Sequence, residues 1–266
     1  MSDLADGHAA THLCPIRSAA GGLIASSWCI DNFAERLAKL PPKITESKIA
    51  RSDLLLAEEG DVSVYYVPFE RVNPMAKVLT IGLTPGRHQM WLAIKAASKV
   101  LRHNGTIGDA LEAASVSASF AGPMRTNLVN MLDEIGVAEW LGLDTTCKLW
   151  TAEASHLEDS TSVLLHPVFV RGENYHGGYN LIARTALLSA YVDQVLANYL
   201  RLVPDALVIP LGKTVAEAVR RTCHDPARVL FGLPHPSGAN GHRKIQFAEH
   251  RDSLIEQVER WAASHP

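Results

Sequence analysis

The sequence predicts an α/β protein, a three-layer sandwich in which a central, mostly parallel sheet of four to five strands carries helices on both faces. Short apolar runs without polar alternation are separated along the chain by segments of helical periodicity, which is typical of a parallel sheet covered on both sides. The chain has 266 residues, of which 47% are hydrophobic and 20% are charged. This composition is that of a globular protein and excludes disordered, collagenous and coiled-coil chains.

Each element is predicted from its own residue pattern. Strands are expected where β-branched and apolar residues run together, at 64–67, 78–83, 162–170, 206–211 and 229–233. Helices are expected where apolar residues recur every three to four positions, at 91–100, 128–135, 188–199, from 214 onward and from 247 onward. Thr84-Pro85-Gly86 interrupts the chain between the second strand and the first helix and predicts a tight turn there.

The domain organisation follows from where these patterns begin. We expect an N-terminal extension at 1–56, partly helical and of unknown role, followed by a single α/β domain at 57–266. The longest uncharged, apolar-leaning stretch, 18–30, is shorter than the ~20 residues that a membrane-spanning helix needs. Asp3 and Asp6 stand where a secretory leader would carry basic residues. We therefore expect a cytoplasmic protein with no membrane contact.

Charge and cysteine content exclude further classes of protein. The net charge of −3 argues against coating of nucleic acid by bulk electrostatics, although it allows a local basic face. Cys14, Cys29, Cys147 and Cys223 lie far apart and form no CxxC pair. Neither a metal clip nor a disulfide scaffold is indicated, and buried or unreactive thiols are expected.

Two loops carry unusual sequences at predicted carboxyl ends of strands, the edge where such sheets bind ligands. The first, Gly82–His88, places two glycines around a proline, so that its backbone can approach a ligand closely. The second, Leu233–Arg243, holds His235 between two prolines and follows it with a serine, an asparagine, a histidine and an arginine. This set of donors suits a phosphate backbone or a polar heterocycle.

Together these loops resemble the uracil-DNA glycosylase superfamily, whose members carry a G-x-x-P-G turn after the first core strand and an H-P-S loop after the last. The resemblance runs from Val78 to Pro266 in the order of motifs of that fold. Segments 119–123, 163–168 and 208–213 are similar to the superfamily's base-stacking segment, base-reading strand and apolar strand ending in Leu-Gly.

The resemblance implies a role for each matching residue. His235 would be catalytic, as the donor that stabilises the departing base, and Thr84 would hold the attacking water. Phe120 would stack on the flipped base, unless it is an ordinary core aromatic. The implied substrate-binding residues are Gly82, Leu83, Pro85, Gly86, Phe120, His166 and Asn174. The implied DNA contacts are Arg87, His88, Ser237, Gly238, Ala239, Asn240, His242 and Arg243.

The chain also departs from the superfamily pattern. Thr84 replaces the aspartate that orients water in many members, and a hydroxyl is too weak a base to deprotonate water at neutral pH. His166 stands at the position where superfamily members carry an asparagine that reads the base. Either His166 or Asn174 therefore reads the uracil edge. If His166 reads it, Asn174 is a turn residue. The cysteine spacing does not fit the superfamily's iron–sulfur members, so no cofactor and no metal are expected.

We therefore expect a monofunctional, hydrolytic uracil-DNA glycosylase that acts in base excision repair, with uracil-containing DNA as its partner and a monomeric state. One alternative is a non-catalytic protein that binds DNA lesions, because Thr84 is no general base. The other is a nucleotide or sugar-phosphate hydrolase that uses the 84–86 turn as a phosphate cradle.

Overall fold

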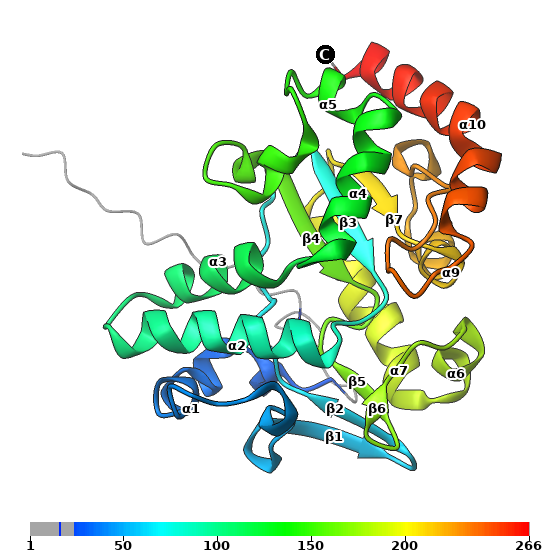
Figure 1. The fold of residues 1–266 in the computed structure, drawn as a ribbon. Coiled ribbons are helices and arrows are strands. Elements are labelled where there is room, and N and C mark those ends of the chain that lie inside the picture. The colour runs from blue at the N-terminus through cyan, green and yellow to red at the C-terminus, as the bar shows by residue number, and fades with distance from the viewer. Residues whose placement is uncertain (1–15, 17–23, 266) are drawn as a thin grey trace, which may run out of the picture.

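A parallel sheet lies at the centre of the molecule. The structure is a computed structural model that describes residue 16 and residues 24–265. The sheet has the strand order β4-β3-β7, in which Val78–Gly82 (β3) lies between Glu158–Ser162 (β4) and Leu207–Pro210 (β7). Helices cover both of its faces (Figure 1). The α/β three-layer architecture is that predicted from the sequence.

Helices make up much of the rest of the described chain. The α-helices are α1 (Ala34–Ala38), α2 (Arg87–Arg102), α3 (Ile107–Ala118), α4 (Pro123–Glu134), α5 (Val137–Trp140), α6 (Tyr179–Arg184), α7 (Ala186–Ala190), α8 (Ala197–Leu202), α9 (Lys213–Thr222) and α10 (Arg243–Ser264). A π-helical segment, Tyr191–Leu196, joins α7 to α8, so the helix predicted at 188–199 is continuous but locally widened. Shorter 3₁₀ turns occur at 26–28, 30–32, 46–48, 52–54, 146–150, 155–157 and 226–228.

Successive residues of the parallel strands face opposite sides of the sheet and enter two different cores. Leu79 and Val208 pack with the α7–α8 segment and α9. Val78 and Ile209 pack with α4 and α10 on the other face. Because both faces of β3 and β7 are buried, these two strands are apolar at nearly every position and lack polar alternation. The edge strand β4 differs, because all five of its residues are polar or charged.

A second sheet, which the sequence did not predict, lies below the first one in Figure 1. It is antiparallel, with the order Leu55–Glu59 (β1), Val62–Tyr65 (β2), Val168–Val170 (β5) and Glu173–Asn174 (β6). The single strand predicted at 162–170 is therefore wrong, because β4 ends at Ser162 and β5 begins in the other sheet. Pro167, which lies between them, has no N–H to donate to a continued ladder.

Two other expectations change. The strand predicted at 229–233 is reduced to one parallel bridge between Val208 and Val229, so only this bridge adds to the three strands of the parallel sheet. Cys147 and Cys223 are free, but Cys29 is buried and disulfide-bonded, so the expectation of free thiols is wrong for Cys29. No helix in the described part of the chain is long and apolar enough to span a membrane.

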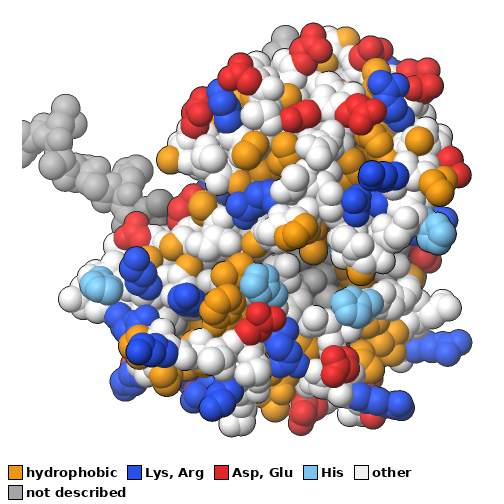
Figure 2. All heavy atoms as spheres, in the orientation of Figure 1, with side chains coloured by type: hydrophobic (Ala, Val, Ile, Leu, Met, Phe, Trp, Pro, Cys, Tyr) orange, Lys and Arg blue, Asp and Glu red, His pale blue; other side chains and the backbone are white. Residues whose placement is uncertain are grey.

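The surface is hollowed where the two sheets approach each other. Figure 2 shows this hollow near the middle of the face, with histidine, lysine and arginine side chains around it. It lies at the carboxyl ends of β3 and β4, whose last residues, Gly82 and Ser162, are paired in register.

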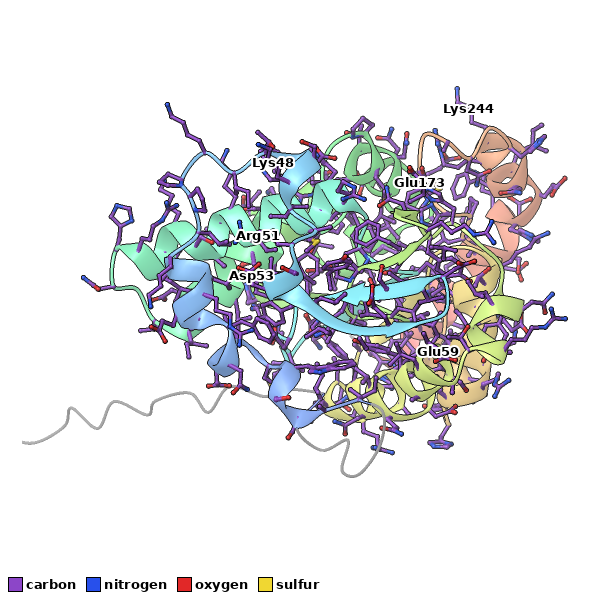
Figure 3. All side chains as sticks on the ribbon, turned by 90° about the horizontal axis from the view of Figure 1, so that it is seen from below. Lys48, Arg51, Asp53, Glu59, Glu173 and Lys244 are labelled. Carbon is purple, nitrogen blue, oxygen red and sulfur yellow. The ribbon has the colours of Figure 1, made fainter. Side chains whose placement is uncertain are left out.

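The first described residues belong to the same body as the rest of the domain. Of the extension predicted at 1–56, residues 1–15 and 17–23 lie outside the described residues. Leu37 and Leu54 are fully buried in a third core, against α2 and α3. Figure 3 shows Arg51 and Asp53, which form an ion pair at 2.8 Å just before β1. The predicted boundary after residue 56 falls inside β1, which is paired with β2.

Candidate functional site

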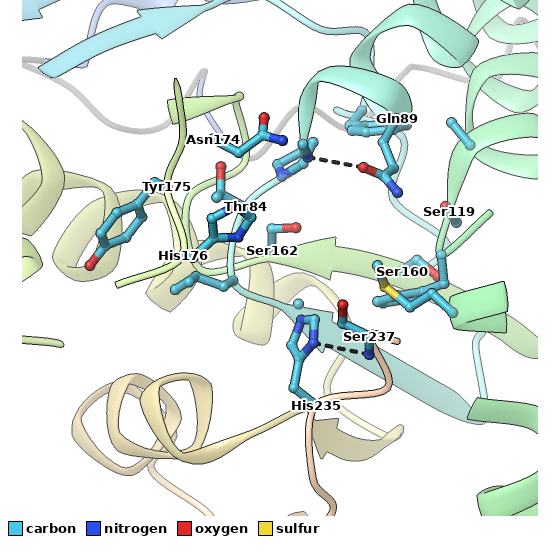
Figure 4. Close-up of a pocket in the computed structure, with 18 of the residues that line it drawn as sticks. Thr84, Gln89, Ser119, Ser160, Ser162, Asn174, Tyr175, His176, His235 and Ser237 are labelled. Atoms are coloured by element: carbon cyan, nitrogen blue, oxygen red, sulfur yellow. Dashed lines mark hydrogen bonds between the residues drawn. The ribbon is translucent and has the colours of Figure 1, made fainter. Parts of the chain in front are cut away.

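A cavity of about 510 Å³ opens at the carboxyl ends of β3 and β4, opposite β6 of the other sheet (Figure 4). Sequence-predicted residues that line it are Gly82, Leu83, Thr84, Pro85, Gly86, Phe120, Asn174, His235, Ser237, Ala239 and Asn240. These residues come from four separate parts of the chain. The tertiary structure therefore brings together the turn, the 119–123 segment, Asn174 and the histidine loop.

His235 projects into the cavity with a defined tautomer (Figure 4). The backbone N–H of Ser237 donates to His235 Nδ1 at 3.2 Å, so Nδ1 is an acceptor and the ring proton lies on Nε2. Burial lowers the pKa of His235 below the ordinary value of 6.5, and the nearby His176 lowers it further. At neutral pH, His235 is therefore a neutral imidazole with one N–H donor available to a ligand.

The end of β7 supports the histidine loop. Gly212 adopts φ +93°, in the left-handed region, and its N–H donates to the carbonyl of Leu233 at 2.9 Å. A Cβ at Gly212 would lie 3.2 Å from His235 Cβ. The Leu-Gly sequence at the end of this strand is thus needed for the close approach of the loop that carries His235.

Two side chains that are predicted to contact DNA, those of Arg243 and Asn240, form hydrogen bonds that hold the loop itself. Arg243 donates to the Ser237 carbonyl at 2.8 Å and to Asn127 Oδ1 at 3.1 Å. Asn127, on α4, donates in turn to the Pro236 carbonyl at 2.9 Å, and Asn240 donates to the His235 carbonyl at 3.2 Å. These four bonds order the segment around His235, and two of the five guanidinium N–H donors of Arg243 are used in them.

Thr84 lines the cavity, but its hydroxyl already has two partners. Oγ1 donates to the His166 carbonyl at 3.1 Å and accepts from the Val168 N–H at 3.2 Å. The hydroxyl proton is therefore used within the protein, and toward a water molecule Thr84 can only accept.

Phe120 stands in a backbone conformation that aromatic residues rarely adopt. Its φ is +51°, in the left-handed region. Its ring edge lies 3.4 Å from where a Cβ at Gly82 would be, so the absence of a side chain at Gly82 makes room for the ring. The half-buried ring lines the cavity and is available for stacking on a planar ligand.

Asn174 is a cavity residue at the end of β6 and not only a turn residue. Its Oδ1 accepts the backbone N–H of Arg87 at 2.9 Å, which fixes the amide orientation. Nδ2 lies 3.6 Å from where a Cβ at Gly86 would be. Gly86 thus leaves the amide NH₂ group open as a donor toward the cavity.

The expectation that His166 reads a base is wrong. His166 is fully buried, does not line the cavity, and is surrounded by the rings of Trp28, Tyr66 and Tyr191. Burial lowers its pKa to about 3, and its Nε2 lies 3.3 Å from the Trp28 carbonyl. Only its backbone carbonyl, which accepts from Thr84, contributes to the site.

The remaining predicted DNA contacts lie outside the cavity. The Arg87 guanidinium donates to the Gly172 carbonyl at 2.6 Å and lies over the Phe169 ring. His88 contacts Glu46 at 2.8 Å. Gly238 and His242 are exposed on the histidine loop. Lys244, beside the loop at the start of α10, points away from the body of the protein in Figure 3.

Comparison with known proteins identifies a relative of most of the chain. The chain is 35% identical over 247 residues to the uncharacterized protein YoxB of Bacillus subtilis (strain 168). The alignment covers 91% of this chain and 96% of the relative. The chain belongs to the YoxB family. No family model matches the chain. The name of YoxB states no activity, so the comparison establishes the family and not the reaction.

In this member of the YoxB family, the sequence interpretation missed several cavity residues. They are Phe69, Gln89, Ala118, Ser119, Met124, Ser160, Thr161, Ser162, Leu165, Tyr175 and His176. Two signals were available: Tyr175 and His176 directly follow Asn174, and Ser160–Ser162 are polar residues at the carboxyl end of a strand.

The cavity carries no fixed charge from the described residues. Its lining contains no lysine, arginine, aspartate or glutamate within the described part of the chain. Its polar groups are hydroxyls, amides and two imidazoles. Such a lining suits a neutral, planar, hydrogen-bonding ligand better than a phosphate or a metal ion.

Proposed function

We propose that this protein is a uracil-DNA glycosylase, which hydrolyses the N-glycosidic bond of uracil in DNA and leaves an abasic site. The observation that carries the proposal is the neutral His235, whose Nδ1 accepts from Ser237 and whose Nε2–H remains free at the cavity. Cleavage of the bond leaves negative charge on the departing base, and a donor placed at the base oxygen stabilises that charge. A neutral histidine supplies such a donor without a metal or organic cofactor.

Other cavity residues support binding of an extruded base. The Phe120 ring offers a stacking surface, and stacking offsets part of the few kcal/mol that unstacking a base from the duplex costs. The Asn174 amide offers donors toward a carbonyl oxygen on the base edge, the role that His166 cannot fill. We propose that the protein acts as a monomer in the cytoplasm, with uracil-containing DNA as its partner.

The direct experiment is release of uracil from single- and double-stranded oligonucleotides, detected as strand cleavage after alkali. We expect cleavage of the uracil oligonucleotide. We expect no cleavage of a matched control oligonucleotide that carries thymine in place of uracil. His235→Ala should slow single-turnover release by ~10²–10³ while the urea midpoint stays near that of the wild type. An unchanged rate would remove His235 from the mechanism.

A non-catalytic lesion-binding protein is the second candidate. It is favoured by the Thr84 hydroxyl, which is engaged with His166 and Val168, and by the lack of a carboxylate in the described cavity lining. This function predicts tight binding of uracil-containing DNA without release of the base. The third candidate, a nucleotide or sugar-phosphate hydrolase, predicts turnover of free nucleotides, yet no lysine or arginine is among the described cavity residues to bind a phosphate.

A further inference from the structure

Few groups at the cavity are able to take a proton from water. Among the described residues that line it, the titratable side chains are Tyr175, His176 and His235. Each of them is a candidate general base, because hydrolysis of the glycosidic bond releases the proton of the attacking water.

Tyr175 and His235 are unsuited to accept this proton. The Tyr175 hydroxyl donates to the Gly178 carbonyl at 2.7 Å, and burial raises its pKa above 10, so it stays protonated. His235 has its basic nitrogen, Nδ1, occupied by the Ser237 N–H. Its other nitrogen carries the proton that the departing base needs.

A buried carboxyl below the cavity floor is also unsuited. Glu158 lies two residues before Ser160 on β4, and Ser160 lines the cavity. The Oε1 atom of Glu158 accepts from Thr80 Oγ1 at 3.0 Å and from the Ser160 hydroxyl. Burial raises the pKa of Glu158 to about 8, so this group is mostly protonated at neutral pH. Of its two hydrogen-bond partners among the described side chains, Thr80 and Ser160, only Ser160 lines the cavity.

His176 remains, and its surroundings leave its basic nitrogen available. It is exposed at the cavity, and no hydrogen bond links its ring to a described residue. Its effect on the pKa of His235 shows that the two imidazoles interact electrostatically, and Figure 4 shows them on opposite sides of the cavity.

The loop that carries His176 is ordered by its neighbour. The Tyr175 ring folds back over the loop, so a Cβ at Gly177 would lie only 2.6 Å from Tyr175 Cε2. The Tyr175–Gly178 hydrogen bond closes the same loop on its far side. His176 is therefore presented from a defined loop, although its side chain is exposed.

We infer that His176 is the general base of the glycosylase reaction, and this inference rests on the proposed function. The water oxygen bonds to C1′ of the deoxyribose while the bond from C1′ to the uracil nitrogen breaks, and the electron pair of that bond leaves with uracil. His235 Nε2–H donates to the oxygen of the departing uracil anion. The imidazole of His176 takes the proton of the water and later returns it to solvent. The uracil anion then takes a proton from solvent, so that water and the uracil nucleotide give uracil and an abasic sugar.

The test compares His176→Asn and His176→Ala with the wild type in single-turnover release from one uracil oligonucleotide. His176→Asn keeps hydrogen-bonding capacity but cannot take a proton. His224→Asn is the matched control, because His224 is exposed and lies outside the cavity. Binding is measured separately with an oligonucleotide that carries 2′-fluoro-2′-deoxyuridine, which resists cleavage.

We expect both His176 variants to lose ~10²–10⁴ in rate, to bind the fluorinated oligonucleotide normally, and His176→Ala to regain activity with added imidazole. A loss below roughly twelvefold, the most that one neutral hydrogen bond accounts for, overturns the inference. A loss without rescue by imidazole, or one explained by weaker binding, also overturns it. If the wild type releases no uracil, the proposed function fails as well, so the wild-type arm separates the two failures.

Discussion

The buried carboxyl of Glu70 should make the stability of this protein fall as the pH rises toward neutrality. Glu70 is fully buried beside Phe69, a cavity residue. Its Oε1 accepts from the Tyr66 hydroxyl at 3.0 Å, and its Oε2 has no hydrogen-bond partner among the described residues. Burial raises the pKa of Glu70 from 4.5 to about 8, although its own backbone N–H and the Tyr66 hydroxyl oppose this shift.

The direction in which the free energy of unfolding changes with pH depends on whether the folded or the unfolded state binds more protons. Between about pH 4.5 and 8, Glu70 is protonated in the folded protein and ionised in the unfolded chain, so the folded state binds the extra proton. The free energy of unfolding therefore decreases as the pH rises through this range. At 1.36 kcal/mol for each pH unit, the contribution of Glu70 between pH 5 and 7 is a loss of roughly 3 kcal/mol.

The assay is urea unfolding at pH 5 and pH 7 of the wild type, Glu70→Gln and Glu249→Gln. The glutamine cannot ionise, so Glu70→Gln should lose roughly 3 kcal/mol less than the wild type between the two pH values. Glu158 and Asp159 are also buried with pKa values raised to about 8 and about 7, so the wild type has further pH dependence that both proteins share. The difference between the two proteins isolates Glu70.

Glu249 is exposed on α10 and serves as the control, whose pH dependence should match that of the wild type. Parallel stability changes of the wild type and Glu70→Gln from pH 5 to pH 7 would refute the reasoning, because they would mean that Glu70 is ionised in the folded protein.

Three further substitutions test the residues around the cavity. Asn174→Ala should reduce single-turnover release of uracil two- to twelvefold, the effect of about 0.5–1.5 kcal/mol for one hydrogen bond, and a normal rate would exclude Asn174 from base reading. Phe120→Ala should weaken binding of the fluorinated oligonucleotide by roughly 1–3 kcal/mol through lost stacking; a lower urea midpoint with normal binding would instead identify a core residue. Thr84→Val removes two hydrogen bonds and should lower the free energy of unfolding by roughly 1–3 kcal/mol, with a rate loss of no more than about twelvefold. A loss beyond a hundredfold in this variant would give Thr84 a direct part in proton transfer.

Local patterns were sufficient for the parallel part of the fold. Strands β3 and β7 and helices α2, α4, α9 and α10 lie where apolar runs and helical spacing predict them. The second sheet was missed because β5 and β6 have three and two residues, too few to show a period, and because their partner strand β2 lies about a hundred residues earlier. The helix α3 was missed because its sequence is rich in alanine and serine and has little apolar contrast.

For the site, the sequence by itself determined the two loops and the edge of the sheet at which they meet, because glycine, proline and strand ends act locally on the backbone. It also determined that no carboxylate stands at position 84. Only the tertiary structure decided that Asn174 faces the cavity while His166 is buried. The orientation of the Asn174 amide is fixed by the Arg87 N–H. The burial of His166 is due to three aromatic rings that are distant in the sequence. The tautomer of His235 and the position of His176 opposite it were likewise decided by the folding of the loops, because hydrogen bonds and electrostatic contacts between separate segments leave no periodic trace in the sequence.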